Sequence, residues 1–128
     1  MGGTNSRCVL LADRHHSLSE GVRSLLQTMF EVVVMVADEP SLAESASRID
    51  PALAVVDLSL ERSGNLDWLT RLKTANPGLK LIVVSVHDEP GVVRAARVAG
   101  ADGFLTKRSI ASELIPAAEA VLAGGHYP

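Results

Sequence analysis

Four polar residues that can do chemistry each come directly after a short apolar run of this sequence. Two are carboxylates, one is a hydroxyl and one is an ammonium group: Asp13, Asp57, Ser85 and Lys107. A carboxylate is ionised at neutral pH, so it can act as an oxygen nucleophile or bind a hard cation. Lysine and serine can hold anionic oxygens through a positive charge and a hydrogen bond. Together these groups are candidates for one site.

The apolar runs that precede these residues have the length of β-strands. Four of the runs are rich in Val, Leu or Ile and do not alternate with polar residues, so we expect both of their faces to be covered. A fifth run is weaker. In chain order the runs are Cys8–Ala12, Val32–Ala37, Ala52–Val56, Leu81–Val84 and the weak Gly103–Thr106.

Segments with helical spacing separate these runs. In the first, five apolar residues fall on one face of a helix: Leu18, Val22, Leu25, Leu26 and Met29. Ser17-Leu18-Ser19-Glu20 reads as a capping box for this helix. Asp88 is a candidate cap before Pro90, and Ser109 is a candidate cap of the last helix. Gly100 is expected to end the helix that starts at Pro90.

Five strand–helix units in about 120 residues predict an α/β fold, a doubly wound parallel sheet with helices on both faces. In such sheets, ligands bind beyond the carboxyl ends of the strands, where the strand order reverses. The residues that follow the strands should therefore meet at one edge. They are Asp13, Arg14, Asp57, Ser85 and Lys107.

The composition indicates a single domain. The chain has 128 residues, a net charge of −3 and 47% hydrophobic residues, so it has no overall attraction to nucleic acid. One cysteine, Cys8, suggests a reducing compartment, and no apolar signal segment or membrane span is visible. We expect a single cytoplasmic domain over 1–128, with a core over 7–123 and the start of a linker over 124–128.

Five segments, in order and spacing, resemble the receiver domain of bacterial two-component response regulators. The segment over 99–107 is the most specific, and 120–127 is similar to the end of receivers in the NarL/FixJ (LuxR-type) subgroup. In that subgroup a linker and a helix-turn-helix DNA-binding domain follow. The remaining matching segments are Val9–His15, Val55–Leu60 and Val83–Asp88.

The resemblance implies the flavodoxin-like strand order 2-1-3-4-5 and a role for each site residue. Asp57 would accept a phosphoryl group from a histidine kinase or a small donor. Mg²⁺ would be bound by Asp13, Asp57 and the backbone carbonyl of Ser59. Ser85 and Lys107 would hold the phosphoryl oxygens. Phe104, which the residues alone indicate only as a partly buried aromatic, would swing inward as Ser85 moves.

Arg14 departs from the family pattern, which has a second acid there as a direct metal ligand. Three carboxylates and one lysine give a local charge of −2, whereas two carboxylates, Arg14 and Lys107 give zero. A unit charge about 4 Å away is worth roughly 4 kcal/mol at an effective dielectric of about 20, before solvent screening. We therefore predict weakened Mg²⁺ binding. Arg14 can also reach Asp57 in place of the metal, or simply be a solvated side chain.

Other departures are milder. Glu61 stands where proline is usual in the family, and is a candidate substitute ligand. Asn65 stands where glycine is usual, and asparagine tolerates a left-handed backbone. Arg108 follows the lysine in place of proline. Pro116 should disturb the last helix by removing a backbone hydrogen bond.

Three functions remain open from the residues. The first is a phosphorylation-dependent switch, and the second is a degenerate receiver that acts as an interaction module, which Arg14 favours. A small α/β enzyme or nucleotide binder ranks last, because no glycine-rich phosphate loop or nucleophile elbow is present. Three histidines near the site edge are a minor alternative for transition-metal binding: His15, His16 and His87.

The resemblance also implies the partners. A sensor histidine kinase would act on the domain, and a homodimer would form through the fourth helix, fifth strand and fifth helix. DNA would be contacted only through an output domain outside these 128 residues, and no membrane contact is expected. The domain would not be an enzyme beyond its own phosphorylation and dephosphorylation at Asp57.

Overall fold

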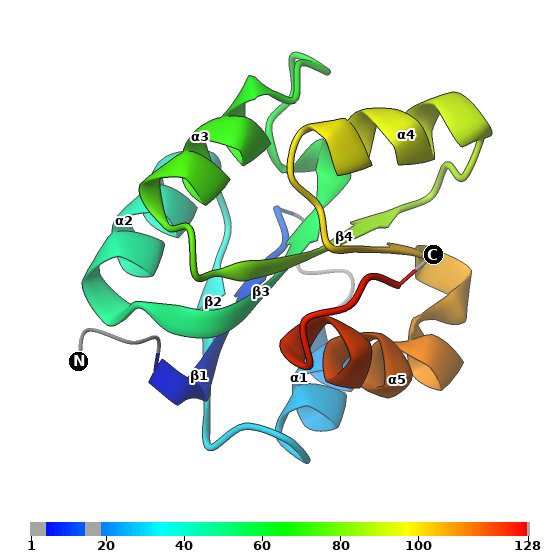
Figure 1. Ribbon diagram of the computed structural model, residues 1–128. Coiled ribbons are helices and arrows are strands. Elements are labelled where there is room, and N and C mark those ends of the chain that lie inside the picture. Colours follow the sequence, from blue (N-terminus) through cyan, green and yellow to red (C-terminus); the bar gives the residue numbers. More distant parts are fainter. Residues whose placement is uncertain (1–4, 15–18, 128) are drawn as a thin grey trace.

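The computed structural model describes residues 5–14 and 19–127. Five parallel strands form one sheet in the order β2-β1-β3-β4-β5, which confirms the predicted topology (Figure 1). The strands are β1 (Asn5–Ala12), β2 (Val32–Val36), β3 (Pro51–Asp57), β4 (Lys80–Ser85) and β5 (Gly103–Thr106). The helices are α1 (Ser19–Leu26), α2 (Glu39–Ile49), α3 (Asp67–Ala75), α4 (Pro90–Val98) and α5 (Ile110–Leu122).

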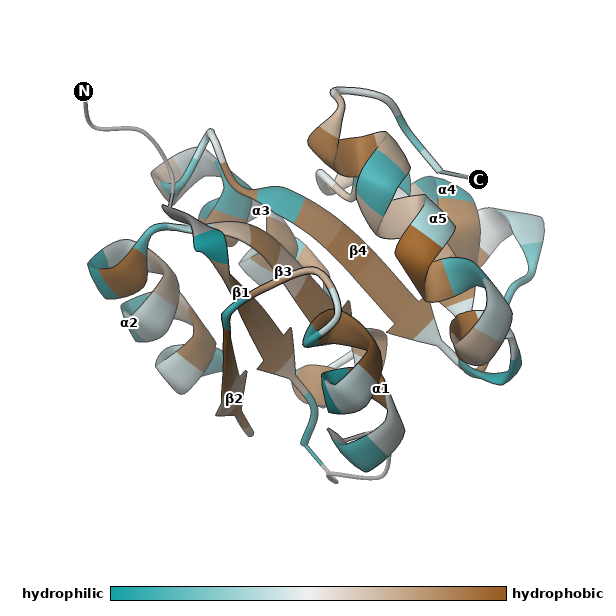
Figure 2. Ribbon diagram, turned by 90° about the horizontal axis from the view of Figure 1, so that it is seen from below, coloured by the Kyte–Doolittle hydropathy of each residue, from teal (hydrophilic) through white to brown (hydrophobic). Residues whose placement is uncertain are grey.

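Helices cover both faces of the sheet. One apolar cluster joins the sheet to α2, α3 and α4, and the other joins it to α1 and α5. Alternate residues of β3 supply the two clusters: Ala54 and Val56 face the first, Leu53 and Val55 the second. Every residue of β3 is buried, and the strands of the sheet are mostly hydrophobic while the helices beside them mix hydrophobic and hydrophilic residues (Figure 2). The near-continuous apolar runs of the sequence follow from this double burial.

The edge strand β2 departs from the expectation that both faces are covered. Val32 is 47% exposed and Met35 36% exposed, while the neighbouring residues are half-buried. The reason is position: β2 pairs only with β1, and the helices pack over the middle of the sheet. An apolar run predicts a strand here correctly but does not predict its place in the sheet.

The ends of α4 follow the prediction only in part. Pro90 begins the helix, but the residue before it, Glu89, is the N-cap and makes no capping hydrogen bond through its side chain. Asp88 is therefore not the cap; it accepts a hydrogen bond from Arg108 instead. Gly100 has a φ of 121° and ends the helix as predicted, since the N–H groups at 100 and 101 donate to carbonyls of its last turns.

The last helix differs from the prediction at two positions. Helix α5 continues through Pro116, which is exposed, so proline does not interrupt it. Ser109 precedes the helix, but its hydroxyl pairs with that of Thr106 at 2.7 Å and does not cap the helix. The predicted capping box of the first helix includes Ser17, which lies outside the described residues.

The end of the described chain lies against the edge of the sheet. Tyr127 forms an isolated bridge with Gly103, and its hydroxyl donates to Glu113 of α5 at 2.9 Å. Its carbonyl oxygen accepts from the Arg97 guanidinium at 3.0 Å. These contacts cover the free edge of β5. None of the helices in the described ranges is long and apolar enough to cross a bilayer.

Candidate functional site

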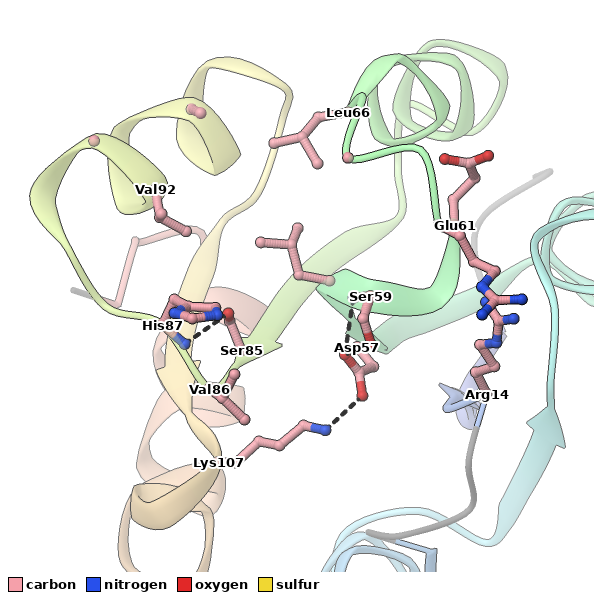
Figure 3. A pocket seen from close by; sticks show the side chains of 15 residues that line it. Arg14, Asp57, Ser59, Glu61, Leu66, Ser85, Val86, His87, Val92 and Lys107 are labelled. Carbon is pink, nitrogen blue, oxygen red and sulfur yellow. Dashed lines mark hydrogen bonds and ion pairs between the residues drawn. The ribbon is translucent and has the colours of Figure 1, made fainter.

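The sheet register brings the predicted site residues to one edge. Ala12 is paired with Val56, so Asp13 and Asp57 end adjacent strands at the same level. Ser85 ends β4, next to the strand that carries Asp57, and Lys107 follows β5. Asp13, Asp57 and Ser85 are all buried. The positions of the strand ends thus confirm the prediction that these groups converge, and Figure 3 shows Asp57, Ser85 and Lys107 around one cavity.

Asp57 is the centre of this edge. One carboxylate oxygen, Oδ1, accepts from the backbone N–H of Ser59 at 2.9 Å and from its hydroxyl at 2.8 Å. The other oxygen, Oδ2, lies 2.8 Å from the Lys107 ammonium. Burial acts to raise the pKa of Asp57, but Lys107 and the two Ser59 donors outweigh it and lower the pKa below its usual value. The carboxylate is therefore ionised at neutral pH.

Ser85 and Lys107 stand on the opposite side of the cavity from Arg14 (Figure 3). The Ser85 hydroxyl accepts from the backbone N–H of His87 at 3.0 Å, which leaves its own hydrogen for an acceptor in the cavity. Lys107 is only 24% exposed. A hydroxyl donor and an ammonium group thus lie on the same side of the Asp57 carboxylate.

Arg14 lines the same cavity as Asp57, but it does not replace Lys107 as the partner of that carboxylate. Among the described residues Arg14 forms no ion pair, and its side chain lies beside Glu61 in Figure 3. Two hydrogen bonds from Ser63 chiefly lower the pKa of Glu61, and the positive charges of Arg71 and Arg14 lower it further. The Glu61 carboxylate thus stabilises the turn at Ser63 through a hydrogen bond, and Glu61 also lines the cavity.

Two further predictions are corrected by the structure. Phe104 is only 5% exposed and packs in the apolar cluster under α4, so it is fully buried. The left-handed residue in the loop after β3 is Gly64, with a φ of 83°; Asn65 is not among the described residues with positive φ. Asn65 instead accepts a hydrogen bond from the N–H of Asp67 at the start of α3.

A cavity of about 610 Å³ opens beside Asp57, between the loop after β3 and the first turns of α4. The sequence analysis did not predict its apolar wall, nor that Arg62 lines the cavity. The wall is formed mainly by Leu58, Leu66, Val92 and Ala95. The sequence of α4 could have predicted this wall, because the helix has more apolar residues than the core uses. Ala96 and Ala99 lie in the core, while Val92 and Ala95 line the cavity.

The donor set for a metal ion is small. Within the described ranges, no group of three or more His, Cys, Asp or Glu side chains is placed to hold a metal. Asp13 and Asp57 are two buried carboxylates at neighbouring strand ends, and oxygen ligands of this kind suit Mg²⁺. Of the three histidines considered for a transition metal, His87 is exposed, and His15 and His16 lie outside the described residues.

Comparisons with known proteins point to one family. A family model for the response regulator receiver domain matches residues 9–119. The chain is 35% identical over 122 residues to the transcriptional regulatory protein UhpA of Salmonella typhimurium, covering 93% of this chain and 60% of that protein. It is 34% identical over 118 residues to the nitrate/nitrite response regulator protein NarP of Escherichia coli, covering 91% and 54%.

A solved structure supports the same assignment. The crystal structure of a LuxR-family two-component response regulator from Aurantimonas sp. SI85-9A1 superposes with a TM-score of 0.85 at 26% identity. The match covers 97% of this chain and 90% of that one. The chain spans between about half and three fifths of the length of the curated relatives it matches, which are longer proteins.

Proposed function

Because this chain belongs to the response regulator receiver domain family and its relatives are LuxR-type transcription regulators, we propose that it is a signalling switch phosphorylated on Asp57. The observation that carries the proposal is the arrangement around this carboxylate. It is buried and ionised, Lys107 lies 2.8 Å away, and Ser85 faces the same cavity. The phosphoryl donor would be a sensor histidine kinase.

The transfer step uses groups of this chain. A carboxylate oxygen of Asp57 forms a bond to phosphorus while the phosphorus–nitrogen bond of the donor histidine breaks. The electron pair of that bond stays on the imidazole, which takes up a proton from solvent. Lys107 balances charge on the phosphoryl oxygens, and the free hydrogen of the Ser85 hydroxyl binds one of them.

A divalent cation would bind weakly at this site. Asp13, Asp57 and the backbone carbonyl of Ser59 would hold Mg²⁺, with water completing the octahedron. The ion, when bound, supplies positive charge to the phosphoryl oxygens. Arg14 lines the same cavity, and its positive charge disfavours the binding of a metal cation there. We therefore expect the affinity for Mg²⁺ to be reduced by orders of magnitude.

The position of Arg14 also favours a second function, that of a receiver that works without phosphoryl transfer. In this alternative the domain is an interaction or dimerisation module. The face made by α4, β5 and α5 would mediate contact with a second copy, and DNA would be contacted through an output domain. Val98 on α4 is 82% exposed and offers apolar surface on that face.

Intact mass after incubation with acetyl phosphate, with and without Mg²⁺, tests these functions. We expect one phosphoryl adduct on the parent chain and none on Asp57→Asn. Arg14→Asp should raise the yield in Mg²⁺, while Arg94→Asp, an exposed change on α4, should not. No adduct on the parent but one on Arg14→Asp would support the module. No adduct on either would contradict the phosphoacceptor role of Asp57.

A further inference from the structure

The cavity beside Asp57 is larger and more apolar than a phosphoryl group requires. Its volume of about 610 Å³ lies in the range of roughly 300–1,000 Å³ typical of sites for small organic ligands. Leu58 and Leu66 form its wall on the side of the loop after β3, and Val92 and Ala95 form it on α4. None of these four apolar side chains has a role in holding phosphoryl oxygens.

Two guanidinium side chains also line the same cavity. Arg14 and Arg62 both line it, and neither makes an ion pair with any residue in the described part of the chain. The two carboxylates of the wall are already engaged: Asp57 lies against Lys107, and Glu61 accepts hydrogen bonds from Ser63. Figure 3 shows Arg14 on the flank opposite Lys107, with Leu66 and Val92 along the far wall.

We propose that this cavity binds a small amphipathic carboxylate, which acts as a second input to the domain beyond the phosphorylation proposed above. Its apolar body would lie between Leu66 and α4, where burial of apolar surface favours binding. Its carboxylate would lie at the guanidinium groups of Arg14 and Arg62, whose planar donors match two carboxylate oxygens.

The apolar wall and the guanidinium groups of the cavity together favour this class of ligand. An inorganic anion would satisfy the guanidinium groups but leave the apolar wall in contact with water. A neutral apolar molecule would cover the wall but would make no ion pair with either guanidinium group. A molecule that carries one carboxylate on an apolar body of several carbons satisfies both, and it also occupies the space into which a phosphoryl group on Asp57 would extend.

An NMR titration of the ¹⁵N-labelled chain tests the proposal with three probes: octanoate, octanol and acetate. We expect octanoate to shift the amides of Leu66, Gly91 and Val92 and to bind at least about tenfold more tightly than either of the other probes. Octanol binding as tightly as octanoate would overturn the role of the guanidinium groups. Shifts spread over the surface, or none near α4, would overturn the site itself.

Matched variants place the ligand. Ala95→Phe fills the apolar end from an exposed position and should lower octanoate affinity about tenfold or more, whereas Ala111→Phe, an exposed alanine on α5, should not. Arg62→Gln should weaken octanoate but leave octanol unchanged, and Arg94→Gln should change neither. Equal effects of a variant and its control would contradict the assignment.

The acetyl phosphate assay separates this proposal from the previous one. Binding of octanoate to a chain that also forms the Asp57 adduct supports two inputs, and octanoate should then slow adduct formation. Octanoate binding without any adduct supports the ligand site and contradicts only the phosphorylation. An adduct without octanoate binding supports phosphorylation and overturns the ligand site.

Discussion

Two lysine–aspartate ion pairs lie at opposite edges of the sheet. Their N–O distances are similar, but their carboxylates are hydrogen-bonded differently. At the amino edge Lys73 lies 2.7 Å from Asp102, and at the carboxyl edge Lys107 lies 2.8 Å from Asp57. The lysine side chains are 25% and 24% exposed, whereas the Asp102 and Asp57 side chains are 13% and 2% exposed. The two pairs therefore differ in the burial of the carboxylate as well as in how it is hydrogen-bonded.

The pair at the amino edge makes several hydrogen bonds to the backbone. Oδ2 of Asp102 accepts from Lys73 and from the backbone N–H of Leu81 at 2.9 Å, and Lys73 also donates to the carbonyl of Leu79 at 2.7 Å. This network ties α3 to the starts of β4 and β5. An ion pair whose charged atoms also make hydrogen bonds to the backbone of two strands holds a structure together.

The pair at the carboxyl edge is not saturated. Oδ2 of Asp57 is fully buried, yet within the described residues no group donates a hydrogen bond to it at an acceptable angle. Its partner Lys107 faces a cavity and not a backbone carbonyl. A buried oxygen with an ion pair but without hydrogen-bond saturation is available to react, and unsatisfied buried groups of this kind are typical of functional sites.

The largest expected effect distinguishes the pairs by stability. Asp102→Ala leaves the Lys73 ammonium and the Leu81 N–H without their shared acceptor, so it should lower the free energy of unfolding by about 3 kcal/mol. Asp57→Ala leaves the Lys107 ammonium facing the cavity, where water can replace the lost partner, so it should cost about 1 kcal/mol or less. Urea unfolding of both variants measures this. Equal losses would show that the two pairs contribute alike to the fold.

Glycines beside the two edges give a smaller contrast. Gly100, with a φ of 121°, packs on Lys73, and a methyl group there would lie 3.2 Å from its Cβ and Cγ atoms. Gly64, with a φ of 83°, has no such neighbour. We expect Gly100→Ala to cost about 2 kcal/mol and Gly64→Ala about 1 kcal/mol, since only backbone strain acts at Gly64. Thermal unfolding of the two variants measures these losses, with Gly21→Ala as a control within a helix. A larger loss for Gly64→Ala than for Gly100→Ala would contradict the prediction.

The smallest effect concerns pH. Because the pKa of Asp57 is lowered on folding, this residue stabilises the fold above its ordinary value of 3.8, and that contribution is lost as the pH falls through the lower folded value. Asp57→Asn should therefore lose stability less steeply than the parent below about pH 4. Ser59→Ala removes one of the donors that lower the pKa and should lie between them. Identical urea midpoints against pH for all three chains would contradict the assignment.

Much of the fold and most of the site residues were predictable from local pattern. The run over 52–56 is apolar without alternation because both faces of β3 are buried, and Asp57 is then the first polar group at its carboxyl end. Parallel pairing brings such strand-end residues together whatever the details of packing. The same logic predicted Ser85 and Lys107, and it extends to any residue whose position depends only on where its strand ends.

Loop and cap details were predicted less well, since competing partners decide them. Asp88 has the right residue type for a helix cap, but Arg108, twenty residues away, takes its carboxylate. The Ser109 hydroxyl likewise forms a hydrogen bond with the Thr106 hydroxyl and so does not cap its helix. Pro116 lies within α5, where packing of the apolar face against the sheet keeps the helix continuous despite the missing backbone donor.

The sequence by itself determined the doubly wound sheet and the set of groups at its carboxyl edge, because burial pattern and strand direction are encoded locally. Only the tertiary structure decided which lysine pairs with Asp57, on which side of the cavity Arg14 lies, and that Leu66 and Val92 face each other across an open space. These relations join residues far apart in the chain. They depend on the distances between packed elements, which no local pattern of residue types specifies.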